Sequence, residues 1–219
     1  MKQYRIAIFD MDGTIVDSRP FHASVFEALF NENWQPVDYR TCYEAVGVTV
    51  RTVFESVGIP PEKHLAFFDL LGGYYQKEAK TMLAKTALAE GIVPVLRHMR
   101  GVGMKTAIVT NSLDAVAELF MEHHDIGGFF DAVVGADRHS HSKNRRCKAL
   151  EERFRLCADE VLYIGDSESD MELAKEMAYD ACFAKTPIAW FKDAGYIANA
   201  LSPKYTVSSY DELLTLLKG

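Results

Sequence analysis

The sequence IAIFDMDGTIVDS, residues 6–18, begins with four apolar residues and runs directly into two aspartates, Asp10 and Asp12. A short apolar run bounded in this way is typical of a strand buried inside a sheet. Carboxylates at the end of such a strand cost free energy when they are buried, unless a hydrogen bond or an opposite charge compensates them. The two aspartates are therefore either the solvated end of a strand or groups with a chemical role.

Further short apolar runs alternate with amphipathic segments along the rest of the chain. The segments SLDAVAELFMEHH (112–124) and DMELAKEM (170–177) place apolar residues at helical spacing. Alternating strands and helices predict a parallel sheet that helices cover on both faces, which is an α/β fold. The expected strands are residues 5–9, 105–109, 132–134, 161–164 and 181–184.

The alternation is interrupted between residues 17 and 86. This stretch carries helical patterns such as PFHASVFEALFNE and KHLAFFDLLGGYYQKEAK, and no convincing buried strand. So much helix exceeds what a simple crossover between two strands needs. We therefore expect a core domain of residues 1–16 and 87–219, and a helical domain of residues 17–86 inserted after the first strand.

The composition narrows the class of protein. A chain of 219 residues that is 48% hydrophobic can build a substantial core, and a net charge of −7 argues against a nucleic-acid binder. No apolar stretch reaches the roughly 18–20 residues of a membrane span, and the first apolar run is too short for a signal peptide. The four cysteines lack metal-site or redox spacing. We expect a cytoplasmic protein, a monomer or small homo-oligomer, with no nucleic-acid or membrane partner.

Polar side chains follow three of the expected strands, and ligands of open α/β sheets bind beyond the carboxyl ends of their strands. Two carboxylates about 5 Å apart repel each other by about 3 kcal/mol at an effective dielectric near 20, which a divalent cation relieves. The candidate ligands are hard oxygens, so Mg²⁺ is favoured over zinc. The residues concerned are Asp10, Asp12, Thr110, Asn111, Ser112, Asp166 and Asp170, with Lys143 close in sequence.

Such a set of groups suits phosphoryl transfer. A carboxylate held beside Mg²⁺ can attack phosphorus and form an aspartyl-phosphate. A second carboxylate can protonate the leaving oxygen and later accept a proton from water. A hydroxyl, backbone N–H groups and a lysine can neutralise the phosphoryl oxygens in the transition state.

Four segments resemble, in the usual order, the signature motifs of the haloacid dehalogenase superfamily. They are DMDGTIVDS (10–18), IVTNS (108–112), Lys143 and GDSESD (165–170). The first motif is highly specific, and the joint occurrence in order extends the resemblance over nearly the whole chain. The resemblance implies a Rossmann-like three-layer core with a helical cap inserted after the first strand.

The resemblance also implies a role for each matching residue. Asp10 would be the nucleophile and Asp12 the general acid/base, which is similar to the phosphatases and phosphomutases of the superfamily, whereas its dehalogenases lack the second aspartate. The other implied roles are phosphoryl binding by Thr110 and the Asn111 backbone, charge neutralisation by Lys143, and Mg²⁺ binding by Asp10, the Asp12 carbonyl and Asp166, with Asp170 ligating or supporting.

Some assignments keep an alternative. An asparagine follows Lys143 where many relatives have proline, and Lys148 competes with it, although the spacing to the fourth motif favours Lys143. Asp170 is either a metal ligand or a first-turn acid of the following helix. In the expected cap, Arg51 and His22 resemble positions near the substrate in relatives, and a solvent-facing helix arginine is the alternative for Arg51.

Together these observations predict a Mg²⁺-dependent phosphatase that hydrolyses a small phosphate monoester through an aspartyl-phosphate, similar to phosphoglycolate phosphatases. A sugar phosphomutase resembling β-phosphoglucomutase is the alternative, because it uses the same residues. A catalytically weak binding or regulatory module is a further alternative, which the four intact motifs disfavour. The sequence does not name the physiological substrate, since side chains of the cap select it.

Overall fold

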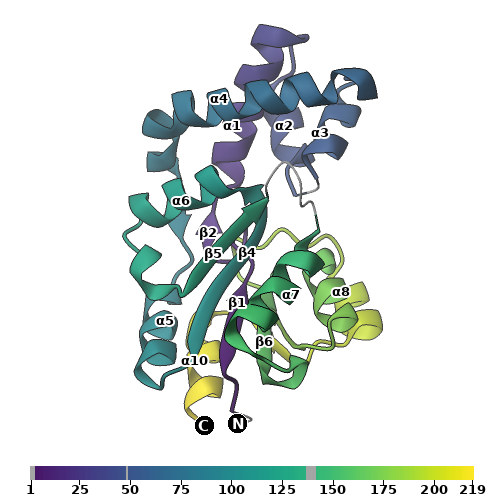
Figure 1. Ribbon diagram of the computed structural model, residues 1–219. Helices are drawn as coiled ribbons and strands as arrows, with labels where there is room; N and C mark the ends of the chain where they lie inside the picture. The colour runs from purple at the N-terminus through teal and green to yellow at the C-terminus, as the bar shows by residue number, and fades with distance from the viewer. Residues whose placement is uncertain (1–2, 48, 137–141) are drawn as a thin grey trace. The chain divides into compact units, whose positions relative to one another are not determined.

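The computed structural model describes residues 3–47, 49–136 and 142–219 (Figure 1). The chain divides into two compact units, one of Met1–Asp17 and Leu88–Gly219 and the other of Ser18–Ala87. Two short strands, β2 (Val16–Asp17) and β3 (Ala87–Leu88), pair as a two-stranded sheet where the chain passes from one unit to the other.

A six-stranded sheet forms the centre of the first unit, in the order β5-β4-β1-β6-β7-β8. Every neighbouring pair is parallel, so the predicted α/β fold with a parallel sheet is confirmed. In β1, Phe9 is in register with Ile108 of β4 on one side and with Ile164 of β6 on the other. The strands are β1 (Ile6–Phe9), β4 (Lys105–Leu113), β5 (Ala132–Ala136), β6 (Val161–Gly165), β7 (Asp180–Ala184) and β8 (Tyr205–Val207).

Helices cover both faces of this sheet (Figure 1). Successive side chains of a strand point to opposite faces, so a strand covered on both faces is apolar throughout, as β1 is. Ile6 and Ile8 share one apolar cluster with Cys147 of α7 and Met171 of α8, and α5, α6 and α10 cover the other face. The helices are α5 (Ile92–Gly101), α6 (Asp114–His123), α7 (Lys143–Phe154), α8 (Glu168–Glu176), α9 (Ala194–Tyr196) and α10 (Tyr210–Lys218). Two short 3₁₀ helices, η3 (Gly127–Phe129) and η4 (Ala158–Glu160), and one π-helix, η5 (Ile197–Leu201), complete the unit.

The first unit departs most from the sequence expectations in β4 and β8, and β5 runs two residues past its expected end, to Ala136. β4 does not end at residue 109 but continues to Leu113, which pairs with Ala136 after a shift of register. The edge strand β8 was not expected, because it has three residues and only Val207 among them is buried. None of these differences moves the residues at the carboxyl ends of β1 and β6.

The second unit is helical, with an aromatic interior. The ring of Phe54 lies 5.7 Å from that of Phe67 and 5.5 Å from that of Phe68, both in edge contacts. Its elements are α1 (Arg19–Asn33), α2 (Tyr39–Ala45), α3 (Val50–Ser56), η1 (Pro61–Lys63), α4 (His64–Met82) and η2 (Leu83–Lys85). Within the described ranges, no helix of either unit has the length and apolar character needed to cross a membrane.

Candidate active site

The carboxyl ends of β1, β4 and β6 bring together side chains that are far apart in sequence. Asp10 follows β1, and its backbone N–H donates to the carbonyl of Ile164 in β6 at 2.9 Å. Asp166 follows β6, and Thr110 lies in the last part of β4. From β1 the chain continues to β4 and β5 on one side and then crosses to β6, β7 and β8 on the other. The strand order therefore reverses at β1, and such a topological switch point is where α/β sheets bind ligands.

The turn after β1 is tight and depends on a glycine. The carbonyl of Met11 accepts hydrogen bonds from the N–H groups of Ile15 at 2.8 Å and Val16 at 3.0 Å. Gly13 has a φ of 77°, in the left-handed region that glycine occupies without strain. A Cβ atom at this position would lie 2.5 Å from Oδ2 of Asp166, so the absent side chain also lets the turn approach that carboxylate.

Three buried carboxylates form the centre of the site. Oxygen atoms of Asp10, Asp166 and Asp170 lie within 4.8 Å of one another. Lys143, the first residue of α7, places its Nζ 2.7 Å from Oδ1 of Asp10 and 2.8 Å from Oδ1 of Asp170. Lys148 is exposed on the same helix. One ammonium group therefore contacts two of three carboxylates, so the cluster has an excess of negative charge when all three are ionised.

The pKa values of these groups follow from burial and from the position of Lys143. Burial raises the pKa of Asp10 well above its ordinary value, and repulsion from Asp170 and Asp166 adds to this against the attraction of Lys143. For Asp170, burial also raises the pKa, but Lys143 and the hydrogen bonds outweigh it and the pKa is lowered. Burial lowers the pKa of Lys143, but the two carboxylates outweigh it and the pKa is raised. Lys143 and Asp170 therefore form an ionised pair.

Asp166 is held by groups from two distant segments. Its Oδ1 accepts a hydrogen bond from the Thr14 hydroxyl at 2.9 Å, and its Oδ2 accepts from the Trp190 backbone N–H at 2.5 Å. Burial, followed by repulsion from Asp170, raises the pKa of Asp166 from 3.8 to about 7. Hydrogen bonds from Trp190 and Thr14 and the charge of Lys143 lower this pKa, but they offset burial and repulsion only in part.

This donor set fits a hard divalent cation such as Mg²⁺. Carboxylate oxygens are the ligands Mg²⁺ prefers, and a cation here would relieve the repulsion that raises the pKa values of Asp10 and Asp166. Asp170 is less available, because Oδ1 already accepts from Lys143 and from Tyr163 at 3.1 Å. Its Oδ2 accepts from the Ser167 hydroxyl at 2.6 Å, in the capping box that starts α8.

Asp12 has a different environment, made of hydroxyl groups. Its Oδ2 accepts hydrogen bonds from the hydroxyls of Thr110 at 3.0 Å and Ser112 at 2.7 Å. The backbone N–H of Ser112 donates in turn to Oγ1 of Thr110 at 3.1 Å. Asp12 is thus coupled to β4, whereas Asp10 is coupled to α7 through Lys143.

Four residues near the site had no role assigned from the sequence. Ser112 follows Thr110 by two positions, a spacing that places both side chains on one side of a strand. Arg146 is a cation on the buried stripe of α7, which is a detectable signal. Tyr163 lies within an apolar strand, where its side chain cannot be told from a core residue. Trp190 contacts Asp166 through its backbone N–H, which is independent of residue type. Neither residue could therefore be recognised from the sequence.

The two predicted substrate-binding residues of the helical segment lie in the second unit, in unlike surroundings. Arg51 is exposed on α3. His22 in α1 is 5% exposed, and its Nδ1 lies 2.8 Å from the hydroxyl of Tyr75 in α4. His22 therefore has a packing role within its own unit, while Arg51 presents its guanidinium to solvent.

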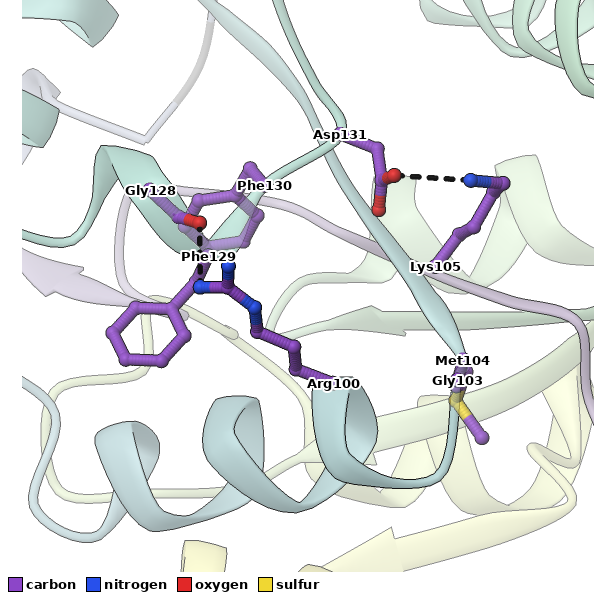
Figure 2. Close-up of a pocket in the computed structure, with 8 residues that line it drawn as sticks. All are labelled: Arg100, Gly103, Met104, Lys105, Gly128, Phe129, Phe130 and Asp131. Atoms are coloured by element: carbon purple, nitrogen blue, oxygen red, sulfur yellow. Dashed lines mark hydrogen bonds and ion pairs between the residues drawn. The ribbon is translucent and has the colours of Figure 1, made fainter.

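A separate hollow of about 240 Å³ lies at the other end of β4 (Figure 2). Its Lys105 is the first residue of β4, about 16 Å along the strand from Thr110. The Lys105 ammonium lies 3.1 Å from Oδ1 of Asp131, and the Arg100 guanidinium donates to the Gly128 carbonyl at 3.2 Å. The two cationic side chains of this hollow thus contact groups of the protein itself. The hollow is distinct from the carboxylate cluster.

Comparisons with known proteins give the family of this chain. The chain is 29% identical over 175 residues to a phosphoglycolate phosphatase from Cereibacter sphaeroides, covering 77% of this chain and 79% of that protein. A phosphoglycolate phosphatase from Aquifex aeolicus is 26% identical over 221 residues, covering 97% and 96%. A haloacid dehalogenase-like family hydrolase from Streptococcus pneumoniae shares the fold, with a TM-score of 0.83 at 20% identity over 99% of this chain and 100% of that one. Residues 7–184 match the model of the haloacid dehalogenase-like hydrolases, and the chain belongs to that family.

Proposed function

We propose that this family member is a Mg²⁺-dependent phosphatase that hydrolyses a small phosphate monoester in the cytoplasm through an aspartyl-phosphate on Asp10. The observation that carries the proposal is the buried Asp10 carboxylate, with Lys143 at 2.7 Å and the carboxylates of Asp166 and Asp170 beside it. A carboxylate so placed is a nucleophile in a site that has an excess of negative charge and needs a metal ion.

The first step is attack of an Asp10 oxygen on phosphorus, which breaks the bond to the leaving alcohol. Asp12 gives its proton to the leaving oxygen. In the second step Asp12 takes a proton from water, the water oxygen attacks the aspartyl-phosphate, and phosphate leaves with Asp10 restored. The Thr110 hydroxyl, the Asn111 N–H and the Lys143 ammonium stabilise charge on the phosphoryl oxygens in both steps.

The metal ion would be held by Asp10, the backbone carbonyl of Asp12, and Asp166. It would supply positive charge against the anionic cluster and the phosphate. Asp170 supports the site by holding Lys143, since both of its carboxylate oxygens already accept hydrogen bonds. This assignment chooses the supporting role among the two that the sequence left open for Asp170.

The substrate class is proposed from the relatives, whose names include phosphoglycolate phosphatase. A small acidic phosphate ester is therefore the first compound to try. We assign the second unit as a cap that selects the substrate, with residues 1–16 and 87–219 as the catalytic core. Arg51 is the better candidate for a substrate contact, because its side chain is exposed whereas His22 is buried against Tyr75.

The test is phosphate release from a panel of metabolite phosphates, with and without Mg²⁺, for the wild type and Asp10→Asn. Asp159→Asn, which changes an exposed carboxylate, is the matched control. We expect Mg²⁺-dependent release that Asp10→Asn abolishes and Asp159→Asn leaves unchanged. Activity that survives in Asp10→Asn would refute the nucleophile. Conversion of glucose 1-phosphate to glucose 6-phosphate without phosphate release would favour the mutase.

A further inference from the structure

Arg146 occupies a position where α7 otherwise buries apolar groups. It lies on the same helical stripe as Cys147 and Leu150, and it is 5% exposed. A buried guanidinium costs considerable free energy unless hydrogen bonds compensate it. The partners of Arg146 therefore indicate what this residue contributes to the protein.

Two of those partners belong to the part of β4 that faces the carboxylate cluster. Nη1 of Arg146 donates to the backbone carbonyl of Thr110 at 2.6 Å, and Nη2 donates to Oδ1 of Asn111 at 2.9 Å. The planar guanidinium thus contacts two consecutive residues with two parallel donors, a geometry that a lysine ammonium does not reproduce.

The need for this contact follows from the irregular pairing of β4. Val109 pairs with Val134 and Leu113 pairs with Ala136, so four steps along β4 correspond to two along β5. A bulge of this kind takes backbone groups out of the regular ladder, and a buried carbonyl then needs a donor from elsewhere. Arg146 supplies that donor to Thr110.

The same residue of β4 carries the hydroxyl that contacts Asp12. Oγ1 of Thr110 donates to Oδ2 of Asp12 at 3.0 Å and accepts from the Ser112 N–H at 3.1 Å. The carbonyl and the hydroxyl of one residue are linked by few rotatable bonds. Holding the carbonyl therefore restricts where Oγ1 of Thr110 can lie.

We propose that Arg146 is a positioning residue, which holds the bulge of β4 so that the Thr110 hydroxyl and the Asn111 N–H meet the phosphoryl group. The inference rests on the proposed phosphatase function. Helix α7 then links the ends of β1 and β4. Lys143 contacts Asp10 after β1, and Arg146, one helical turn later, contacts Thr110 in β4.

A double-mutant cycle tests this coupling. We expect Arg146→Met to lower kcat about tenfold or more and to raise the inhibition constant of inorganic phosphate. In a Thr110→Ala background, where the hydroxyl is absent, the same substitution should change kcat less than about twofold. Equal fold-changes in both backgrounds would overturn the proposal. Arg145→Met, at the exposed neighbouring position, is the control and should match the wild type.

A second measurement does not depend on turnover. In crystals of Arg146→Met we expect the hydrogen bond between Thr110 Oγ1 and Asp12 Oδ2 to be lost or the bulge to shift, and unchanged geometry would overturn the proposal. If Arg146→Met does not fold, Arg146→Lys replaces it in both experiments, because it keeps the charge and loses the two-donor contact. Failure of the wild type to release phosphate would refute the proposed function, while these crystals would still decide the role of Arg146.

Discussion

Replacement of Lys143 with methionine removes the ammonium group that contacts both Asp10 and Asp170, and keeps a chain of similar length. The Lys143 side chain is 11% exposed and that of Asp170 is 1% exposed, so water screens this pair little. Removing one partner of a buried ion pair costs about 3–5 kcal/mol. At about 2–4 °C per kcal/mol for a chain of this size, the Tm should fall by about 6–20 °C.

The effect on catalysis should exceed the effect on substrate binding. In the proposed mechanism the Lys143 ammonium stabilises the phosphoryl oxygens, and loss of one such donor lowers kcat about 10²–10³-fold. The assay is phosphate release at saturating Mg²⁺ and substrate, at a temperature below the Tm of the variant. Thermal unfolding followed by circular dichroism gives the Tm of each protein.

Lys148→Met is the matched control, since Lys148 lies on the same helix, is exposed, and competes with Lys143 for the third motif in the sequence. We expect its Tm and kcat to remain close to those of the wild type. A folded Lys143→Met protein that keeps kcat within about threefold, or a loss of activity in Lys148→Met, would refute the assignment of the lysine and the electrostatic reasoning behind it.

Three further predictions concern the metal site and its supports. Because the pKa of Asp166 is raised to about 7, Mg²⁺ must displace a proton from this carboxyl group below that pH. The Mg²⁺ affinity measured by calorimetry should therefore rise up to about tenfold per pH unit as the pH approaches about 7, and level off above it. A flat profile between about pH 5.5 and 7 would contradict this. Gly13→Ala should lower the unfolding free energy by about 1–3 kcal/mol in denaturant titrations and weaken Mg²⁺ binding. The reason is that residue 13 has a left-handed φ and the added Cβ would lie 2.5 Å from Asp166 Oδ2. An unchanged denaturation midpoint would contradict this and show that the turn relaxes. Ser112→Ala removes one of two hydroxyl donors to Asp12 and should lower kcat about tenfold in steady-state assays, whereas wild-type kinetics would mean that Thr110 alone suffices.

The central strands were predictable because parallel strands buried on both faces are short, continuous apolar runs. The apolar runs of β1 and β6 are obvious in the sequence. In the structure each of these strands begins and ends within one residue of the expected bounds. β8 shows the limit of this signal, since a three-residue edge strand with one buried residue has no apolar run to detect. The end of β4 was misjudged because the residues after Val109 are polar, although pairing resumes at Leu113.

The helix after β6 shows a similar limit. The residues after its last turn, AYDA (178–181), include no glycine, so the sequence does not mark where this helix ends. The structure gives Ala178 a φ of 57°, the left-handed conformation that glycine adopts at this position in many helices. The chain then enters β7, which packs against α8, and such tertiary contacts are not visible in one sequence.

Candidate site residues fall into two classes: those that the sheet topology brings together, and those whose contacts depend on the path of a loop. Asp10 and Asp166 follow apolar runs directly, so the sheet topology alone brings them together at one edge. Contacts made by the backbone of a loop, such as Trp190 N–H to Asp166, depend on the path of the chain and leave no pattern of residue types. Arg146 lies between these classes, because a cation on an apolar stripe is detectable while its partner is not.

The contrast between Asp10 and Asp12 offers a physical reason why one motif supplies two roles in the proposed mechanism. Asp10 contacts the ammonium of Lys143, which donates in every state and so favours the carboxylate form. Asp12 contacts the hydroxyls of Thr110 and Ser112, which can donate to a carboxylate or rotate to accept from a carboxylic acid. A group that must release a proton and later recover it needs partners that tolerate both states, and a nucleophile needs a partner that favours one. In the proposed mechanism the two aspartates therefore differ in function through their neighbours, since they share the same strand end.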